Sequence, residues 1–291
     1  MTLRYDTVSF LSDYGRTDEF VGVVHSVLRS LAPEVRVIDI THDIAPYDVR
    51  AGALTLVRAA EHLASGVVIA VVDPTVGTTR RAIAVEIGDG SSVLLGPDNG
   101  LLAPVVNACG GPDRIVEITA ADVVFEGRSG TFDGRDVFAP AAAFLCNGGD
   151  LAELGPPVDP NSLLPAMVPI PREEEGRLHA EALWVDRYGN VQLNVEPEVL
   201  HSVVDGPGET VRLVFEGGAR HARIVGTFAE LERGEFGLLV DSFGLYAIVQ
   251  DRASAADGLG VATASAIAIE RLDSTEPPSV VTSVELGVRR T

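Results

Sequence analysis

One short segment of the sequence combines residue types that could activate a water molecule. Asp73 follows the apolar run 67–72, and a Pro/Gly turn then leads to two adjacent cations, Arg80 and Arg81. A carboxylate beside an arginine stays ionised, because each charge favours the charged form of the other. Such a pair can orient a water molecule and accept one of its protons. The same pattern is typical of an ion pair that only braces a loop, and spacing alone leaves both interpretations open.

Polar residues also end two other apolar runs in the first half of the chain. Asp13 follows one run, and the sequence Asp-Ile-Thr-His-Asp at 39–43 ends the other. Ligands of open α/β sheets bind outside the carboxyl ends of the strands, so these residues predict a shared site. Together with Asp73, the carboxylates and His42 could also hold a divalent metal, which makes a metal-dependent hydrolase one alternative. Their spacings match no metal-ligand signature, so we expect no metal.

Alternating strand-like and helix-like runs must position these residues. Apolar residues at helical spacing begin at Phe20 and stop at Pro33, and a second helical pattern ends at Gly66. Continuous apolar runs such as 67–72 are typical of strands covered on both faces. The sequence therefore predicts a layered α/β domain with a mainly parallel sheet over residues 1–154.

The second half of the chain has a different pattern. Residues 155–176 are rich in proline, which continues neither a helix nor a central strand, so we expect a linker there. Over residues 177–291, short strands alternate with Gly-rich turns in a manner typical of hairpins. The predicted fold class is α/β with a second, C-terminal domain that is a small β-barrel or sandwich.

Composition restricts the partners and the location. The formal net charge of -20 argues against nucleic acid and anionic membranes, because binding to phosphates needs clustered Lys and Arg. The sequence holds neither a dinucleotide fingerprint nor a Walker lysine motif. Two cysteines make no disulfide framework, and neither a signal peptide nor a membrane-spanning run stands out. We therefore expect a soluble, cytoplasmic protein that acts on a small molecule.

Six segments, taken in order along the chain, resemble the S-adenosylmethionine hydroxide adenosyltransferases, relatives of fluorinating and chlorinating enzymes. The matching segments are 12–22, 40–44, 72–81, 96–100, 131–136 and 186–190. The resemblance implies hydrolysis of S-adenosyl-L-methionine to adenosine and L-methionine, by attack of water or hydroxide on the ribose C5′. It also implies a homotrimer, with each site between the N-terminal domain of one subunit and the C-terminal domain of the next. No cofactor beyond the substrate is implied.

The resemblance assigns roles to individual residues. Asp73 and Arg80 would be catalytic, together with Asp133. The substrate-binding residues would be Asp13 for the ribose hydroxyls, Asp18 and Asp186 for the methionine ammonium, Asn190 for the adenine or ribose, Tyr47 and Phe228 for packing on the nucleoside, and Ser242 for the methionine carboxylate.

Two positions depart from the pattern of this family. Asp133 stands where the family commonly has a histidine, and Thr75 where it usually has glycine. A second carboxylate opposes hydroxide unless it is protonated or paired with an arginine. Asp133 could therefore act as an alternative base, orient Arg80 or weaken turnover. A protein that binds the nucleoside without turnover is thus a second alternative, whereas a halogenase is disfavoured because Asp73 and Asp133 would repel a halide.

Replacing Asp73 tests the assigned chemistry. The Asp73→Ala variant loses the carboxylate that would orient the water, so we expect adenosine production from S-adenosyl-L-methionine to be abolished. Chromatographic quantification of adenosine measures the loss. Near-full activity of this variant would refute the assignment.

Overall fold

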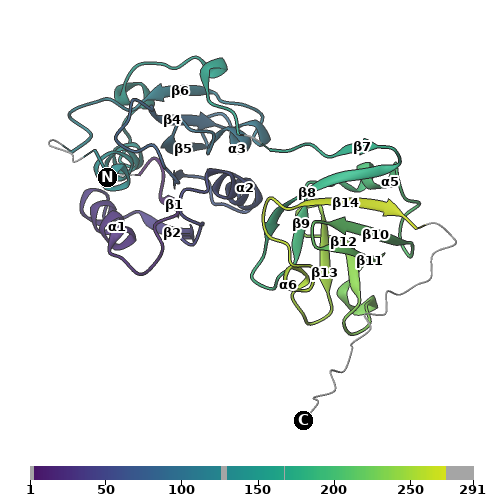
Figure 1. The fold of residues 1–291 in the computed structure, drawn as a ribbon. Helices are drawn as coiled ribbons and strands as arrows, with labels where there is room; N and C mark the ends of the chain where they lie inside the picture. Colours follow the sequence, from purple (N-terminus) through teal and green to yellow (C-terminus); the bar gives the residue numbers. More distant parts are fainter. Residues whose placement is uncertain (1–2, 126–129, 167, 273–291) are drawn as a thin grey trace, which may run out of the picture. The chain divides into compact units, whose positions relative to one another are not determined.

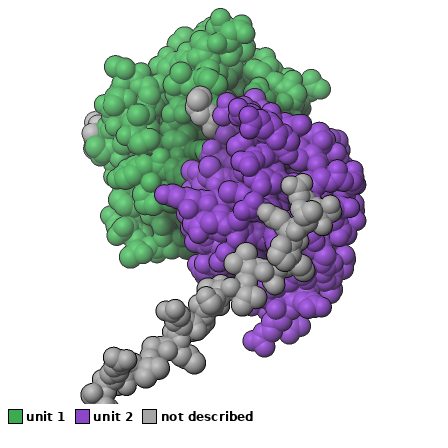
Figure 2. Space-filling model, turned by 45° about the vertical axis from the view of Figure 1, so that its right-hand side comes forward, with its two compact units in different colours: residues 1–168 green, residues 169–291 purple. Residues whose placement is uncertain are grey.

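The computed structural model describes residues 3–125, 130–166 and 168–272, which form two compact units (Figures 1 and 2). Unit 1 comprises Met1–Val168 and unit 2 comprises Pro169–Thr291, so the division falls within the Pro-rich segment. Residues 273–291 of the predicted C-terminal domain lie outside the described residues. Within the described part of the chain, no helix has the length and apolar character needed to cross a bilayer.

A six-stranded sheet, in the order β2-β1-β3-β5-β4-β6, forms the centre of unit 1. Its strands are β1 (Thr7–Ser12), β2 (Arg36–Thr41), β3 (Val67–Val71), β4 (Ala82–Ile87), β5 (Ser92–Pro97) and β6 (Arg114–Glu117). The neighbours β2, β1, β3 and β5 pair in parallel, whereas β4 runs antiparallel to both β5 and β6. The predicted α/β architecture is confirmed, with an antiparallel edge added to a parallel sheet.

Helices pack on this sheet through their apolar faces. They are α1 (Phe20–Leu31), α2 (Val49–Ala60), α3 (Ala103–Ala108) and α4 (Ala139–Cys146), and a π-helical turn, η1 (Gly134–Phe138), leads into α4. Phe10 and Ile69 of the sheet share one buried cluster with Val24 of α1 and Leu145 of α4. A side-chain cap starts α2, since Asp48 Oδ1 accepts a hydrogen bond from Ala51 N at 2.8 Å. Burial of the apolar helix faces against the strands thus holds the sheet and the loops at its edge in place.

The Pro-rich segment is partly attached to unit 1. Its start follows the 3-10 turn η2 (Leu151–Leu154), and a second turn, η3 (Pro160–Ser162), lies within it. Arg81 Nη1 donates to Ser162 Oγ at 2.9 Å, and Leu164 N donates to Asp98 Oδ1 at 3.0 Å. These bonds hold residues near 162–164 against the start of β4 and the loop that follows β5.

Unit 2 is a closed barrel, which decides between the barrel and the sandwich predicted from the sequence. Seven strands follow one another in the order β14-β10-β11-β12-β13-β9-β8, and pairing of β14 with β8 closes the ring. The strands of the barrel are β8 (Arg177–Val185), β9 (Val191–Leu193), β10 (Thr210–Phe215), β11 (Gly218–Ile224), β12 (Phe236–Val240), β13 (Tyr246–Gln250) and β14 (Ala266–Arg271). A further strand, β7 (Arg172–Glu174), pairs with β8. Unit 2 also has two short helices, α5 (Pro197–His201) and α6 (Ala255–Leu259). Alternate residues along β10 are buried, as a barrel interior requires.

The core of unit 1 should depend strongly on the central strand β5. Leu95 is fully buried there, so Leu95→Ala should lower the free energy of unfolding by about 2–5 kcal/mol through lost burial and a cavity. Leu164 is 52% exposed, and the same truncation there should change stability by about 0.5 kcal/mol or less. Denaturant titrations followed by circular dichroism compare the two variants, and equal effects would contradict this packing.

Candidate active site

Arg80 holds two carboxylates together at the carboxyl end of β3. Its Nε donates to Asp73 Oδ2 at 2.7 Å, and its Nη2 donates both to Asp73 Oδ2 and to Asp133 Oδ2. The side chains are largely buried, with exposed fractions of 9% for Arg80, 4% for Asp73 and 12% for Asp133. Although burial opposes the charge, hydrogen bonds and attraction from both carboxylates raise the pKa of Arg80. The guanidinium therefore stays charged, and the three predicted catalytic residues meet in one cluster.

Local structure fixes the Asp73 carboxylate from both sides. Thr75 donates twice to Asp73 Oδ1, from its backbone N at 3.2 Å and from Oγ1 at 3.0 Å. The peptide before Asp73 is held as well, because Asn99 Nδ2 donates to Val72 O at 2.8 Å. Sequence reasoning singled out Thr75 only as a departure from a family pattern, and it missed the role of Asn99.

The other carboxylate is placed by a close contact between two loops. Asp133 directly precedes the π-helical turn η1, an irregular turn that is frequent at functional sites. A Cβ built on Gly134 would lie 2.4 Å from Tyr14 Oη, so only glycine allows the loop to approach this ring. Burial, aided by the nearby charges of Asp13, Asp133 and Asp73, raises the pKa of Tyr14. Tyr14 therefore remains a neutral phenol beside the cluster.

The two adjacent arginines have separate partners. Whereas Arg80 binds Asp73 and Asp133, Arg81 Nε donates to Asp98 Oδ2 at 2.9 Å and Arg81 Nη1 donates to Ser162 Oγ at 2.9 Å. Arg80 is thus the cation at the candidate site, and Arg81 braces the loop. The contacts of Arg81 fit the interpretation of a structural ion pair, and the role of Arg80 as part of a reactive pair stays a prediction.

Three predicted substrate-binding residues of unit 1 lie in loops beside the sheet. Asp13 Oδ2 accepts a hydrogen bond from Tyr47 N at 2.9 Å, which brings the loops after β1 and β2 together. Tyr47 is 73% exposed and has φ of 69°, a left-handed conformation that is strained for a bulky residue. Burial and, more weakly, the charge of Asp73 raise the pKa of Asp13. Asp18 is exposed in the loop before α1.

Two of the predicted residues in unit 2 are brought into contact. Asp186 Oδ1 accepts from Asn190 N at 2.9 Å, and Asp186 Oδ2 accepts from Asn190 Nδ2 at 2.8 Å, which closes the turn between β8 and β9. Phe228 lies in a short 3-10 turn and is 46% exposed. Ser242 lies exposed in the turn between β12 and β13.

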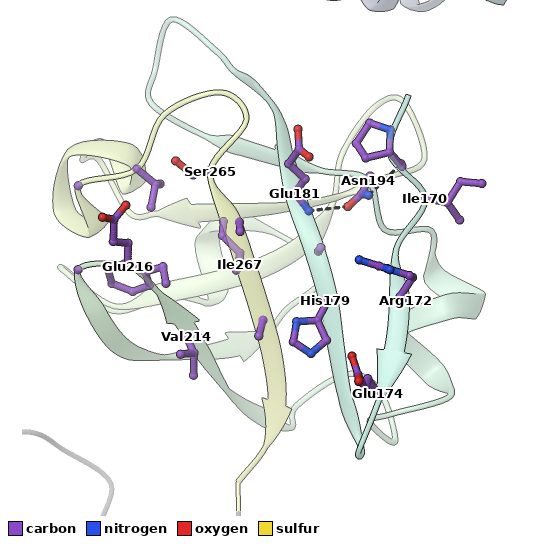
Figure 3. Close-up of a pocket in the computed structure, with 18 residues that line it drawn as sticks. Ile170, Arg172, Glu174, His179, Glu181, Asn194, Val214, Glu216, Ser265 and Ile267 are labelled. Atoms are coloured by element: carbon purple, nitrogen blue, oxygen red, sulfur yellow. Dashed lines mark hydrogen bonds between the residues drawn. The ribbon is translucent and has the colours of Figure 1, made fainter. Parts of the chain in front are cut away.

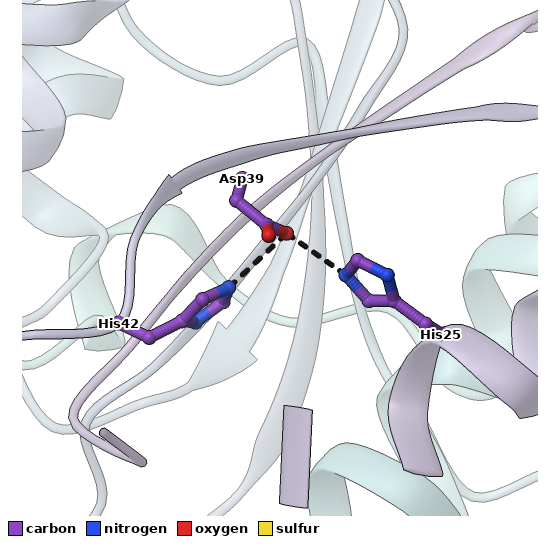
Figure 4. A group of neighbouring side chains, drawn as sticks. All are labelled: His25, Asp39 and His42. Carbon is purple, nitrogen blue, oxygen red and sulfur yellow. Dashed lines mark hydrogen bonds and ion pairs between the residues drawn. The ribbon is translucent and has the colours of Figure 1, made fainter. Parts of the chain in front are cut away.

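Asp39 and His42 belong to a different cluster, which also includes His25 (Figure 4). Asp39 Oδ1 lies 2.8 Å from His25 Nε2 and 3.1 Å from His42 Nε2, and His42 Nδ1 lies 2.8 Å from Ser12 Oγ. Burial lowers the pKa of His42, which favours the neutral imidazole. Burial by itself would raise the pKa of Asp39, but interactions with His42 and His25 outweigh burial and lower this pKa. Sequence reasoning missed His25, because it lies within the apolar pattern of a helix.

Hydrogen bonds join Asp39 of β2 to His25 of α1 and His42 to Ser12 of β1, and Asp39 lies within ion-pair distance of His42. The 2.8 Å separation is a hydrogen-bond length, and it is shorter than the roughly 3.4 Å between two ligands of a tetrahedral zinc ion. Of the residues considered for a shared metal, Asp39 and His42 group with His25. The others have separate partners: Asp13 accepts from Tyr47, Asp43 lies 3.9 Å from Arg16, and Asp73 binds Arg80. The described residues therefore do not bring all five together, and the absence of a metal stays a prediction.

Two cavities bear on where a ligand could bind. A cavity of about 620 Å³ lies on the barrel wall of unit 2, where side chains of β8 and β14 line it, and none of the predicted site residues does (Figure 3). A cavity of about 350 Å³ in unit 1 is lined by Arg80, Asp133 and Glu117, together with threonines 78, 79 and 119. The smaller cavity, rather than the larger, borders the ion-pair cluster.

Comparisons with known proteins point to one family. Residues 8–155 match the description "SAM hydroxide adenosyltransferase N-terminal domain", and residues 180–268 match the corresponding C-terminal domain. A protein of Salinispora tropica named "(R)-S-adenosyl-L-methionine hydrolase" is 44% identical over 254 residues, covering 87% of this chain and 94% of that protein. A protein of Actinopolyspora mzabensis named "Fluorinase" is 27% identical over 233 residues, covering 72% of this chain and 78% of that protein.

A solved structure shares the fold over nearly the whole chain. It is the crystal structure of an uncharacterized conserved protein from Thermotoga maritima, with a TM-score of 0.83 and 30% sequence identity. The match covers 91% of this chain and 100% of that chain, so both units have counterparts there.

Removing the shared cation should destabilise unit 1. Arg80→Met leaves two buried carboxylates facing each other unpaired, and we expect a loss of about 3–5 kcal/mol in the free energy of unfolding. Adding Asp73→Asn to this variant removes one of the two negative charges, and we expect it to recover part of the lost free energy of unfolding. Arg29 is exposed, so Arg29→Met serves as the control, with an expected change of about 0.5 kcal/mol or less. Denaturant titrations that show no loss for Arg80→Met would contradict the pairing.

Proposed function

The chain belongs to the S-adenosylmethionine hydroxide adenosyltransferase family, and on this basis we propose that it hydrolyses S-adenosyl-L-methionine to adenosine and L-methionine. The relative from Salinispora tropica, 44% identical over 254 residues, is named as such a hydrolase. The observation that carries the proposal in this chain is the buried cluster of Asp73, Arg80 and Asp133.

The chemistry required is the positioning of a nucleophile. The leaving group is a neutral thioether expelled from a sulfonium cation, so it needs no proton. Water is a poor nucleophile, because its pKa in bulk is about 15.7. Holding the water in line with the C5′–S bond can supply roughly 7–11 kcal/mol of the barrier. Hydrogen bonds to Asp73 and Asp133 fix the Arg80 guanidinium in place, and this rigidity of the cluster is what such orientation needs.

The charge of the cluster suits this substrate. Two carboxylates share one guanidinium, so the cluster carries one net negative charge while both carboxylates are ionised. A negative, largely buried cluster attracts a sulfonium cation and repels a halide. Neutral water avoids that repulsion, which favours hydrolysis over halogenation.

Binding roles follow from the side chains that remain accessible. Asp13 keeps Oδ1 for the ribose hydroxyls, since Tyr47 N occupies Oδ2. The exposed rings of Tyr47 and Phe228 can pack on the nucleoside. Asp18 and Asp186 would face the methionine ammonium, with Asn190 on the nucleoside side and Ser242 at the methionine carboxylate.

We further propose a homotrimer in which the barrel unit of one subunit completes the site of its neighbour. Support comes from the resemblance, and from the division of the expected binding residues between two units. No cofactor and no nucleic-acid or membrane partner is proposed. The cytoplasmic location stays a prediction.

Isotope labelling tests the reaction directly. Turnover in water enriched in heavy oxygen should give adenosine that carries one heavy oxygen at the 5′ position, because the attacking atom comes from solvent. Mass spectrometry of the product, with chloride or fluoride added in parallel, separates the outcomes. Unlabelled adenosine or a 5′-halogenated nucleoside would overturn the proposal, and tight binding without any product would favour the nucleoside-binding alternative.

A further inference from the structure

The two carboxylates on Arg80 differ sharply in how many hydrogen bonds they accept. Asp73 accepts two from Thr75 on Oδ1 and two from Arg80 on Oδ2. Asp133 accepts one, from Arg80 Nη2 on Oδ2, within the part of the chain that the structure describes. Among the described residues no donor is bound to Asp133 Oδ1, which leaves this oxygen for a ligand, whereas both oxygens of Asp73 are occupied.

This difference separates the chemical roles of the two groups. A carboxylate oxygen has room for about two hydrogen bonds, and each oxygen of Asp73 already accepts two. The Asp73 side chain is also only 4% exposed, so a water molecule has little access to it. Asp133 is 12% exposed and accepts fewer hydrogen bonds from described residues, so it is the more accessible partner for a water molecule.

The cavity beside the cluster gives Asp133 a route to solvent. Asp133 lines this cavity of about 350 Å³ together with Arg80 and Glu117, and Asp73 is not among the described residues that line it. A proton on Asp133 can therefore leave to water in this cavity.

We propose that Asp133 accepts the proton of the attacking water, and that Thr75 is a positioning residue that keeps Asp73 as the fixed anion of Arg80. This inference rests on the proposed hydrolysis. The water oxygen forms a bond to C5′, and the C5′–S bond breaks with its electron pair going to sulfur. One water proton moves to Asp133 Oδ1 and then through the cavity to solvent, while the other remains on the 5′-hydroxyl of adenosine. Each turnover releases one proton.

Replacing Asp133 with histidine gives the sharpest test. If residue 133 is the acceptor, kcat rises with pH as that side chain loses its proton. Histidines ordinarily lose their proton at a higher pH than aspartates, so the rise of kcat at the acid side of its pH profile, the acid limb, should move to higher pH in Asp133→His. Asp133→Asn should lower kcat about 100-fold or more. Asp122 is exposed, and Asp122→His should leave the limb in place.

Thr75 is tested by a pair of substitutions. Thr75→Val removes the Oγ1 hydrogen bond to Asp73, and we expect kcat to fall about threefold to tenfold with little change in KM. Thr75→Ser keeps a hydroxyl and should recover most of the rate. Equal rates for both variants and the parent chain would refute the positioning role.

The outcomes separate this inference from the proposed function. If the parent chain makes no adenosine, the proposed function fails. If it makes adenosine but the acid limb does not move in Asp133→His, or Asp133→Asn keeps near-full kcat, only the assignment of the acceptor fails. Thermal unfolding of each variant, compared with the parent, identifies any that lose activity through misfolding.

Discussion

A single cation shared by two buried carboxylates is the interaction on which the candidate site depends. Arg80 reaches Asp73 at the end of β3 and Asp133 before η1, positions that are 60 residues apart along the chain. Buried carboxylates without a counter-charge are strongly destabilising, so neither loop can hold its aspartate here without the guanidinium. Because two carboxylates share one guanidinium, the cluster carries one net negative charge while both are ionised. This charge attracts a cationic substrate and does not repel a neutral water molecule.

The surrounding fold keeps this arrangement rigid. Parallel pairing of β1 with β2 and β3 brings their carboxyl ends to one edge, where Asp13 and Asp73 lie. Asn99 holds the end of β3, and the approach of Tyr14 to Gly134 sets the start of η1. Arg81 ties the same segment to Ser162. The site therefore draws on four loops that a hydrophobic core holds in place.

Much of this could be predicted from the sequence, and the failures have physical reasons. Apolar runs that end in aspartate identified the edge of the sheet, and the order of the motifs assigned Asp133 to the same site as Asp73 and Arg80. Spacing could not separate Arg80 from Arg81, because the direction of adjacent side chains depends on the loop path. His25 was missed because its position fits the apolar pattern of α1, although its ring contacts Asp39. Hairpin patterns alone do not distinguish a barrel from a sandwich, because closure depends on the distant pairing of β14 with β8.

The most direct test of the central claim is a crystal structure of the protein with adenosine and L-methionine bound. The account predicts that the 5′-oxygen of adenosine lies within about 3.2 Å of Asp133 Oδ1, with Arg80 still bridging Asp73 and Asp133. A 5′-oxygen bound by Asp73 instead, or an Arg80 side chain turned away from both carboxylates, would contradict it.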